Sequence, residues 1–259
     1  MTAAARTDPE LVGRPRTIRP RVAHLHLGTA PHAADAEFDV GHGRDSITWT
    51  AVIPAIVLAA GRSTRMGRAK ASLPVDDRDT FLSRIVRTLL AADVDDVVVV
   101  LGHEAEAIAA SFASSGLPAR FVINRDYDRG QLSSLKVGLG VADRPGVTAV
   151  LVTLVDVPLV AASTVRAVLD RYRETRAPIV RPVDGSRHGH PLIIDRALFR
   201  ELRTADEDAG AKPIVRAHVS ARGDVAVADE GAFADIDTSE DYRLLITDAS
   251  AGSGPGPMD

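Results

Sequence analysis

The sequence predicts a three-layer α/β fold around a central sheet that is mainly parallel. Short apolar segments of strand length alternate with longer segments of helical period over residues 53–247. The segment 97–101 is apolar at every position, as a strand covered on both faces should be. In residues 80–92, apolar side chains recur every three to four positions, which places them on one face of a helix.

Each expected element follows from its local pattern. Short apolar runs predict strands, and helical period together with capping residues predicts helices. The expected strands are residues 55–59, 97–101, 119–123, 147–154, 178–181, 191–194 and 225–228. The expected helices are residues 80–92, 104–114, 133–142, 161–175, 196–203 and 212–219, followed by one capped by Ser239.

The two ends of the chain differ from this folded part. Residues 1–52 are rich in proline and charged residues and lack an apolar stretch of strand or helical period. We expect this extension to be disordered, because it cannot bury enough apolar surface to offset its ordering entropy. Residues 248–259 predict a flexible tail. Residues 53–247 then form one domain with a substantial core.

Composition excludes several classes of function. The chain has 31 Lys and Arg against 35 Asp and Glu, a formal charge of −4, so no strongly basic surface attracts nucleic acid. The absence of cysteine excludes disulfides, thiolate metal sites and a cysteine nucleophile. No segment reaches the roughly 18 apolar residues of a membrane span, and no secretion signal is visible. We expect a cytoplasmic protein without nucleic-acid or membrane partners.

The loop after the first expected strand has the character of an anion site. Gly61 and Gly67 allow backbone amides to approach a ligand closely. The side chains of Arg62, Arg65 and Lys70 add positive charge that suits a triphosphate. The spacing fits neither a P-loop nor a dinucleotide-binding motif. A tight turn with solvated arginines is the alternative.

Residues 58–70, LAAGRSTRMGRAK, resemble the signature of the MobA-like nucleotidyltransferases, which make molybdenum cofactor dinucleotides. Four further segments follow in the order of that family, so the resemblance extends to Tyr242. It implies a Rossmann-like nucleotidyltransferase fold and the transfer of a nucleotide to an acceptor phosphate with release of pyrophosphate. The catalytic residues that it implies are Lys70, Arg65 and Asp156.

Two aspartates are candidate metal ligands. Asp156 follows the most apolar expected strand, where ligands bind in α/β sheets, although it could instead cap the next turn. Asp237, taken alone, is better explained as a cap of the last helix. The resemblance implies that Asp156 and Asp237 hold Mg²⁺ against the nucleotide phosphates, with Asp235 as the weaker candidate.

A second segment, GQLSSL at residues 130–135, resembles the GQSSSL segment that lines the nucleotide site of the family. Leu132 replaces the usual first serine. A glycine turn followed by hydroxyl caps is the alternative. The expected nucleotide-binding residues are Leu58, Ala59, Ala60, Gly61, Arg62, Gly67, Gln131, Ser133, Ser134 and Asp156.

Two later segments, GHP at 189–191 and EDAGAK at 207–212, resemble the acceptor-side GHP and GDxGAR elements of the family. Glu207 stands where glycine is common, and Lys212 where arginine is common. For Gly189 and Pro191, shaping of the backbone is the alternative. The expected acceptor-binding residues are Gly189, His190, Pro191, Asp208, Gly210 and Lys212.

The resemblance also implies the substrates. Ala60-Gly61 matches the cytidylyl members of the family, whereas guanylyl members carry Gly-Gly, so the implied nucleotide is CTP. The implied acceptor is molybdopterin, and a molybdoenzyme would receive the product. Two alternatives stay open: another small phosphate, phosphonate or sugar phosphate as acceptor, or a non-catalytic chaperone that binds a nucleotide or cofactor.

Overall fold

The computed structural model of the protein describes residues 52–251, without the side chains of Arg65 and of residues 247–251. The expected disordered extension lies outside the described residues except for Val52, and the expected tail lies outside them from residue 252 onward. The last helix, α7 (Ser239–Ala251), continues past residue 247, where the domain was expected to end.

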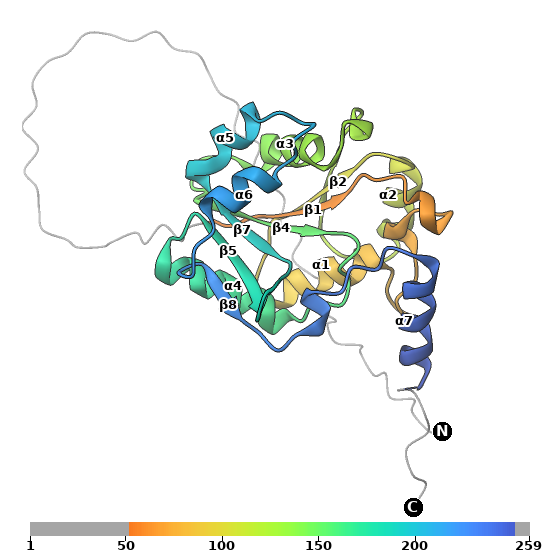
Figure 1. Ribbon diagram of the computed structural model, residues 1–259. Coiled ribbons are helices and arrows are strands. Elements are labelled where there is room, and N and C mark those ends of the chain that lie inside the picture. Colours follow the sequence, from red (N-terminus) through yellow and green to blue (C-terminus); the bar gives the residue numbers. More distant parts are fainter. Residues whose placement is uncertain (1–51, 252–259) are drawn as a thin grey trace, which may run out of the picture. The chain divides into compact units, whose positions relative to one another are not determined.

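A mixed sheet of eight strands runs through the described residues (Figure 1), in the order β3-β2-β1-β4-β7-β5-β6 with β8 paired to β5. The four strands β3, β2, β1 and β4 are parallel, whereas β7 is antiparallel to both of its neighbours. The strands are β1 (Ala55–Ala59), β2 (Val97–Leu101), β3 (Arg120–Ile123), β4 (Ala149–Leu154), β5 (Ile179–Asp184), β6 (Arg187–His188), β7 (Leu192–Asp195) and β8 (Asp224–Ala226).

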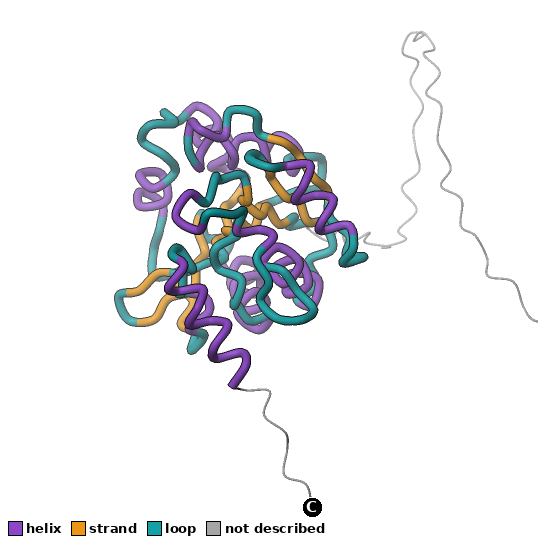
Figure 2. Tube along the Cα trace, turned by 90° about the vertical axis from the view of Figure 1, so that its right-hand side faces the viewer, coloured by secondary structure: helices purple, strands orange, loops and turns teal. Residues whose placement is uncertain are grey.

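Helices cover both faces of this sheet, as Figure 2 shows with the strands at the centre. One apolar cluster packs α1, α2 and α4 on one face, and a second packs α3, α5 and α6 on the other. These helices are α1 (Phe81–Ala91), α2 (Ala105–Ala113), α3 (Gln131–Ala142), α4 (Ala162–Thr175), α5 (Phe199–Thr204) and α6 (Lys212–His218). The predicted three-layer α/β fold with a mainly parallel, mixed sheet is confirmed.

Strand β1 illustrates why the central strands read as continuous apolar runs. All of its residues are buried. Because side chains alternate along a strand, Val57 packs in the cluster with α1 while Ile56 and Leu58 pack in the cluster with α3.

Among the described residues, no helix combines the length and the apolar character that crossing a membrane requires.

The sequence pattern located most elements and missed some details. The short strand β6 was not predicted, because both of its residues are exposed and carry no apolar pattern. The expected helix 196–203 is a 3-10 turn followed by α5. Thr238, rather than Ser239, caps α7: its Oγ accepts from the N–H of Asp241, whose carboxylate accepts from the N–H of Thr238.

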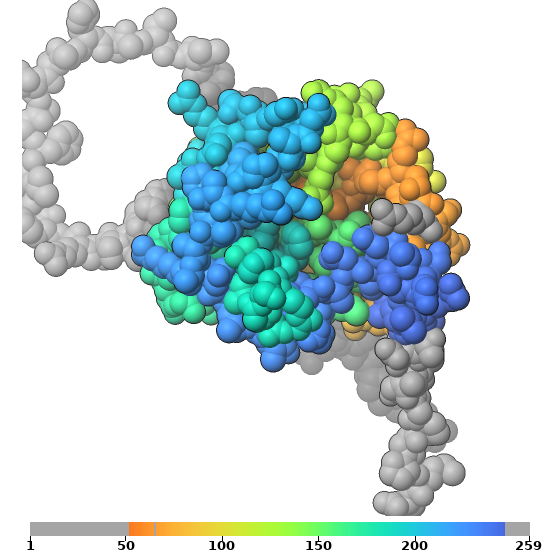
Figure 3. All heavy atoms as spheres, in the orientation of Figure 1, coloured from red at the N-terminus to blue at the C-terminus, as the bar shows by residue number. Residues whose placement is uncertain are grey.

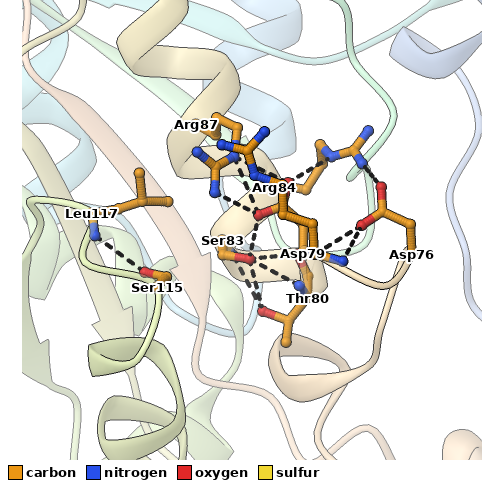
Figure 4. A network of polar contacts seen from close by, with 9 residues as sticks. Asp76, Asp79, Thr80, Ser83, Arg84, Arg87, Ser115 and Leu117 are labelled. Atoms are coloured by element: carbon orange, nitrogen blue, oxygen red, sulfur yellow. Dashed lines mark hydrogen bonds and ion pairs between the residues drawn. The ribbon is translucent and has the colours of Figure 1, made fainter.

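A buried carboxylate fixes the loop that precedes α1 (Figure 4). The carboxylate of Asp79 accepts hydrogen bonds from Arg87 (2.9 and 3.0 Å) and from Ser83 Oγ (3.1 Å). A small apolar cluster joins this loop to the segment before α7 through the side chains of Leu73, Val75, Phe81 and Ile236. The loop before α1 therefore packs against the segment that leads into α7.

Candidate functional site

A pocket of about 270 Å³ opens at the carboxyl ends of β1 and β4. In Figure 3, the orange residues that follow β1 and the blue residues that lead into α7 border a hollow on the same face. This is the edge at which ligands bind in α/β sheets. The expected site residues that line this pocket are Leu58, Ala59, Ala60, Gly61, Lys70, Gln131, Ser134 and Asp156.

The ammonium group of Lys70 lies between two carboxylates at the pocket. Its Nζ is 2.6 Å from Asp237 Oδ1 and 3.7 Å from Asp156 Oδ2. The Lys70 side chain is only 10% exposed. The backbone N–H of Ile236 donates to the carbonyl oxygen of Asp156 (2.9 Å), which holds the segment carrying Asp237 beside the end of β4. The fold thus brings these three charged residues together from distant parts of the chain.

Asp156 has an oxygen that suits a bound cation. Its Oδ1 is buried and has no hydrogen-bond partner among the described atoms, which is uncommon for a buried polar group. Burial raises the pKa of Asp156 above its ordinary value; Lys70 opposes this shift, whereas the carboxylates of Asp235 and Asp237 add to it. Mg²⁺ prefers carboxylate oxygens together with substrate phosphates, so Asp156 and Asp237 fit such an ion.

Two expected nucleotide-binding residues of the first loop do not line the pocket. Arg62 instead pairs with Asp128 through two hydrogen bonds (2.6 and 2.8 Å) and lies over the ring of Tyr127, which does line the pocket. Gly67 is exposed and has a φ of 68°, which a turn at this position requires. The side chain of Arg65 lies outside the described atoms.

The two serines at the start of α3, Ser133 and Ser134, have different surroundings. Both serines are buried, and Ser134 lines the pocket whereas Ser133 does not. Asn124 Nδ2 donates to the Oγ of Ser133 (2.8 Å) and of Ser134 (3.0 Å), so it fixes the start of α3 under the pocket. The sequence reasoning missed Asn124. Its signal was a polar residue directly after the strand now seen as β3.

The expected acceptor residues do not share one pocket. His190 lines a second, smaller cavity, and Pro191 lines a separate, mostly apolar crevice together with residues of α1 and α4. The side chains of Asp208 and Lys212 are exposed. Gly189 supports the backbone alternative, because a Cβ at this position would lie 2.1 Å from the carbonyl oxygen of Ala232. Gly210 has a φ of 69°, a conformation that favours glycine.

An ion-pair network that the sequence did not indicate joins α3 to the loop before α6. Lys136 Nζ donates to Glu207 Oε1 (3.0 Å) and to the carbonyl oxygen of Ala205 (2.8 Å). Arg129 Nε lies 2.9 Å from Glu207 Oε2. Glu207 therefore connects the segment expected to bind the nucleotide with the segment expected to bind the acceptor.

Comparison with known proteins assigns a family to this architecture. Residues 55–222 match the family model described as the MobA-like NTP transferase domain. The chain is 34% identical to nicotine blue oxidoreductase of Paenarthrobacter nicotinovorans, over 74% of this chain and 96% of that protein. It is 29% identical to a probable molybdenum cofactor guanylyltransferase of Mycobacterium avium, over 73% of this chain and 93% of that protein.

A solved structure agrees with the same family. The crystal structure of Rv0371c from Mycobacterium tuberculosis H37Rv superposes with a TM-score of 0.62 at 33% identity, covering 76% of this chain and 98% of that chain. Rv0371c has also been solved in complex with manganese, and that structure superposes with a TM-score of 0.59.

Proposed function

This chain belongs to the MobA-like NTP transferase family and is a nucleotidyltransferase, and we propose that it transfers CMP from CTP to a terminal phosphate of molybdopterin. The observation that carries the proposal is the position of Lys70, which lines the pocket together with Asp156 and whose ammonium group lies between the carboxylates of Asp156 and Asp237. A lysine beside two carboxylates is the chemistry of a site that binds a triphosphate with a divalent cation.

In this proposal, an acceptor phosphate oxygen attacks the α-phosphorus of CTP in line. The new P–O bond forms as the bond to the β-phosphate oxygen breaks, and pyrophosphate leaves. The attacking oxygen is already anionic near neutral pH, so no general base is required. The chain then contributes positioning and electrostatic stabilisation. The ammonium group of Lys70 stabilises the negative charge of the triphosphate and of the leaving pyrophosphate.

Asp156 and Asp237 would hold Mg²⁺, which supplies charge neutralisation at the phosphates. The unpartnered Oδ1 of Asp156 supports this assignment. The manganese complex of Rv0371c supports a divalent cation in the family. Gly61, Gln131 and Ser134 line the same pocket and would contact the nucleotide in this proposal.

The acceptor and the base are the specific parts of the proposal. The similarity to a probable molybdenum cofactor guanylyltransferase supports molybdopterin as the acceptor. Ala60-Gly61 in the first loop supports CTP over GTP. Another small phosphate, phosphonate or sugar phosphate is the alternative acceptor, since the residues around the nucleotide would be unchanged. A chaperone that only binds the nucleotide or cofactor is the alternative from another class.

The deciding experiment measures pyrophosphate release with CTP, GTP or UTP, with Mg²⁺ and with either molybdopterin or a panel of sugar phosphates and phosphonates. Release that requires both CTP and molybdopterin supports the proposal. Release with another acceptor selects the alternative enzyme, and tight nucleotide binding without release selects the chaperone.

The 34% identity to nicotine blue oxidoreductase over 96% of that protein favours a second candidate, oxidation–reduction of a heterocyclic substrate. The same preparation should therefore be incubated with a reduced nicotinamide dinucleotide cofactor and nicotine blue. Oxidation of that cofactor that requires nicotine blue and no nucleoside triphosphate would establish the second activity.

A further inference from the structure

Tyr127 belongs to the pocket that contains Lys70 and Asp156. It opens the 3-10 turn Tyr127–Arg129, which leads into α3. Among the described residues that line the pocket, it is the only aromatic one, and it is partly exposed. The proposed function places the phosphates at Lys70 and Asp156 and assigns no side chain to the flat face of the base.

The ring of Tyr127 is seated on the backbone that follows β2. A Cβ at Gly102 would lie 2.7 Å from Tyr127 Cβ and 2.8 Å from Tyr127 Cγ. The same Cβ would lie 2.6 Å from the carbonyl oxygen of Ala60, a residue that lines the pocket. The base of the ring therefore lies beside the loop after β1, in space that a side chain at position 102 would take. The ring of His103 adds a tilted contact, with 6.1 Å between the ring centroids.

Arg62 and Asp128 form a clamp over this ring. The guanidinium carbon of Arg62 lies 5.5 Å from the centroid of the Tyr127 ring. Nε and Nη2 of Arg62 donate to the two carboxylate oxygens of Asp128, at 2.8 and 2.6 Å. Both side chains are exposed, so the pair adds little to stability. Its paired bonds fix the orientation of the guanidinium, which in turn favours one position of the ring.

Tyr127 and the charged residues of the pocket lie on opposite sides of β1. Tyr127 rests on Gly102, directly after β2, whereas Asp156 follows β4, and β1 separates these two strands in the sheet. Neighbouring strands are about 4.8 Å apart, so the two sides of the pocket are on the order of 10 Å apart. A nucleotide that has its phosphates at Lys70 can therefore reach Tyr127 with its base, because the ribose spans the space between them.

We propose that Tyr127 is the stacking platform for the base of the nucleoside triphosphate, and that Arg62 is a positioning residue that holds this platform rather than a ligand of the phosphates. The inference rests on the proposed function, because it takes a nucleoside triphosphate as the ligand of the pocket. Every base has a π face, so stacking adds affinity without choosing among bases. The choice between CTP and GTP is then left to the loop after β1.

Equilibrium binding tests the platform without requiring turnover. Calorimetry with Mg²⁺ measures the affinities of CTP, UTP and GTP, and that of inorganic triphosphate, which carries the phosphates without a base. The variants are Tyr127→Leu, which removes the ring, and Tyr127→Phe, which keeps it. Phe121→Leu is the matched control, because Phe121 is an exposed aromatic residue of β3 that does not line the pocket.

We expect Tyr127→Leu to weaken each of the three nucleotides about tenfold or more, and to leave the affinity for inorganic triphosphate within about twofold. Tyr127→Phe and Phe121→Leu should bind all four probes as the wild type does. A merely structural tyrosine would give the opposite result, with lower thermal stability and an unchanged ratio of the affinities for CTP and inorganic triphosphate.

Arg62→Gln tests the positioning role. It should weaken CTP about threefold, leave inorganic triphosphate unchanged and have no further effect in a Tyr127→Leu background, since it acts through the ring. Arg62→Lys keeps a cation but loses the paired bonds to Asp128, so it should give an intermediate loss. Weaker binding of inorganic triphosphate by Arg62→Gln would place Arg62 on the phosphates and overturn this part of the proposal.

Unchanged affinity for CTP in a folded Tyr127→Leu variant would overturn the platform, as would an equal loss of inorganic triphosphate or a loss confined to one base. If Tyr127→Leu does not fold, the change at the exposed Arg62 decides, because an unchanged ratio for CTP and inorganic triphosphate would then overturn the proposal. Wild-type protein that binds inorganic triphosphate but no nucleotide would overturn it as well. Wild-type protein that binds CTP through Tyr127 but never releases pyrophosphate would contradict the proposed function alone.

Discussion

The roles of single residues depend on how each charge is surrounded. Only three of the 31 basic residues are lysines, and among them Lys70 is nearly buried between Asp156 and Asp237. An ammonium is a compact charge, whereas a guanidinium is a wide planar fork. Lys136 lies in the middle of α3, and its ammonium group contacts a carboxylate and a carbonyl oxygen, which a guanidinium can also reach.

Lys70→Arg is expected to lower kcat at least about a hundredfold, because the larger head group does not fit between the two carboxylates and the triphosphate. Lys136→Arg is the control and should keep kcat within about threefold. Steady-state pyrophosphate release measures both. Near-normal turnover of Lys70→Arg would remove Lys70 from the proposed mechanism.

The substitution Asp156→Asn is expected to lower activity without lowering thermal stability. The raised pKa of Asp156, caused mainly by burial, means that its charged form is unfavourable in the fold. A neutral isostere should therefore leave the midpoint of thermal unfolding at pH 7 unchanged or higher. The same change should lower kcat at least about a hundredfold, because a ligand for the cation is lost. A clear drop in thermal stability with preserved turnover would contradict both expectations.

Between secondary-structure elements, two sets of side-chain contacts hold the segments around the candidate site together. The loop before α1 carries the Asp79 network and packs against Ile236, next to Asp237. The O–H of Tyr242 in α7 donates to the carbonyl oxygen of Pro74 in that loop (3.0 Å). On the opposite face of the sheet, Glu207 joins α3 to the segment before α6. Each connection links segments that are far apart in the sequence.

Asp79→Asn is expected to lower the free energy of unfolding at pH 7 by about 1–3 kcal/mol, because it weakens the hydrogen bonds from Arg87 to a buried carboxylate. The loss stays in this range because the arginines around Asp79 are partly exposed and screened. Burial alone would raise the pKa of Asp79, but hydrogen bonds from Arg87 and Ser83 and the charges of both arginines lower it.

The pH dependence of that loss follows from the lowered pKa. A carboxyl whose folded pKa lies below its unfolded value of about 3.9 stabilises the protein above that value and loses the effect as the pH falls through the folded pKa. Denaturant unfolding should therefore show the full difference between wild type and Asp79→Asn at pH 5–7 and a shrinking one below about pH 4. A constant difference down to pH 2 would show that the carboxylate charge is not responsible.

Glu207→Gly restores the residue that is common in the family and removes the link between α3 and the loop before α6. We expect faster amide exchange in residues 205–212 and an acceptor KM raised about three- to tenfold, with the affinity for CTP unchanged. Glu207→Gln, which keeps the length of the side chain but not its charge, should give an intermediate value. Unchanged amide exchange in the glycine variant would show that the loop is held by other contacts.

At the scale of the whole molecule, the sheet order creates the site. β1 lies between β2 and β4, and its carboxyl end opens into the pocket that contains Lys70 and Asp156. Strand β7 adds to β4 in the antiparallel sense, so the segment with His190 arrives at the same edge from the opposite direction.

Deletion of residues 1–47 is expected to leave transfer activity and the thermal midpoint within experimental error. The variant keeps Val52, which pairs with Val147 at the start of the sheet. Activity and unfolding of the shortened and full-length proteins are compared side by side. A collapse of activity would show that the N-terminal extension takes part in function.

The three-layer fold, the bounds of β1 and β2, and the meeting of Lys70 and Asp156 in one pocket could be predicted from the sequence. This was possible because strand and helix periods and glycine turns are written in neighbouring residues, and because parallel strands end at a common edge. The catalytic roles of Lys70 and Asp156 stay predictions.

Most side-chain contacts between distant parts of the chain depend on how the elements pack in the folded protein. Lys70 contacts Asp237 across 167 positions, and Arg62 turns away to Asp128 across 66. The same applies to the Glu207 network and to the cavity at His190, which depend on how α3, α6 and β7 pack. Local patterns do not specify such partners, because a side chain's neighbours across the fold are set by strand order and helix packing rather than by its own segment.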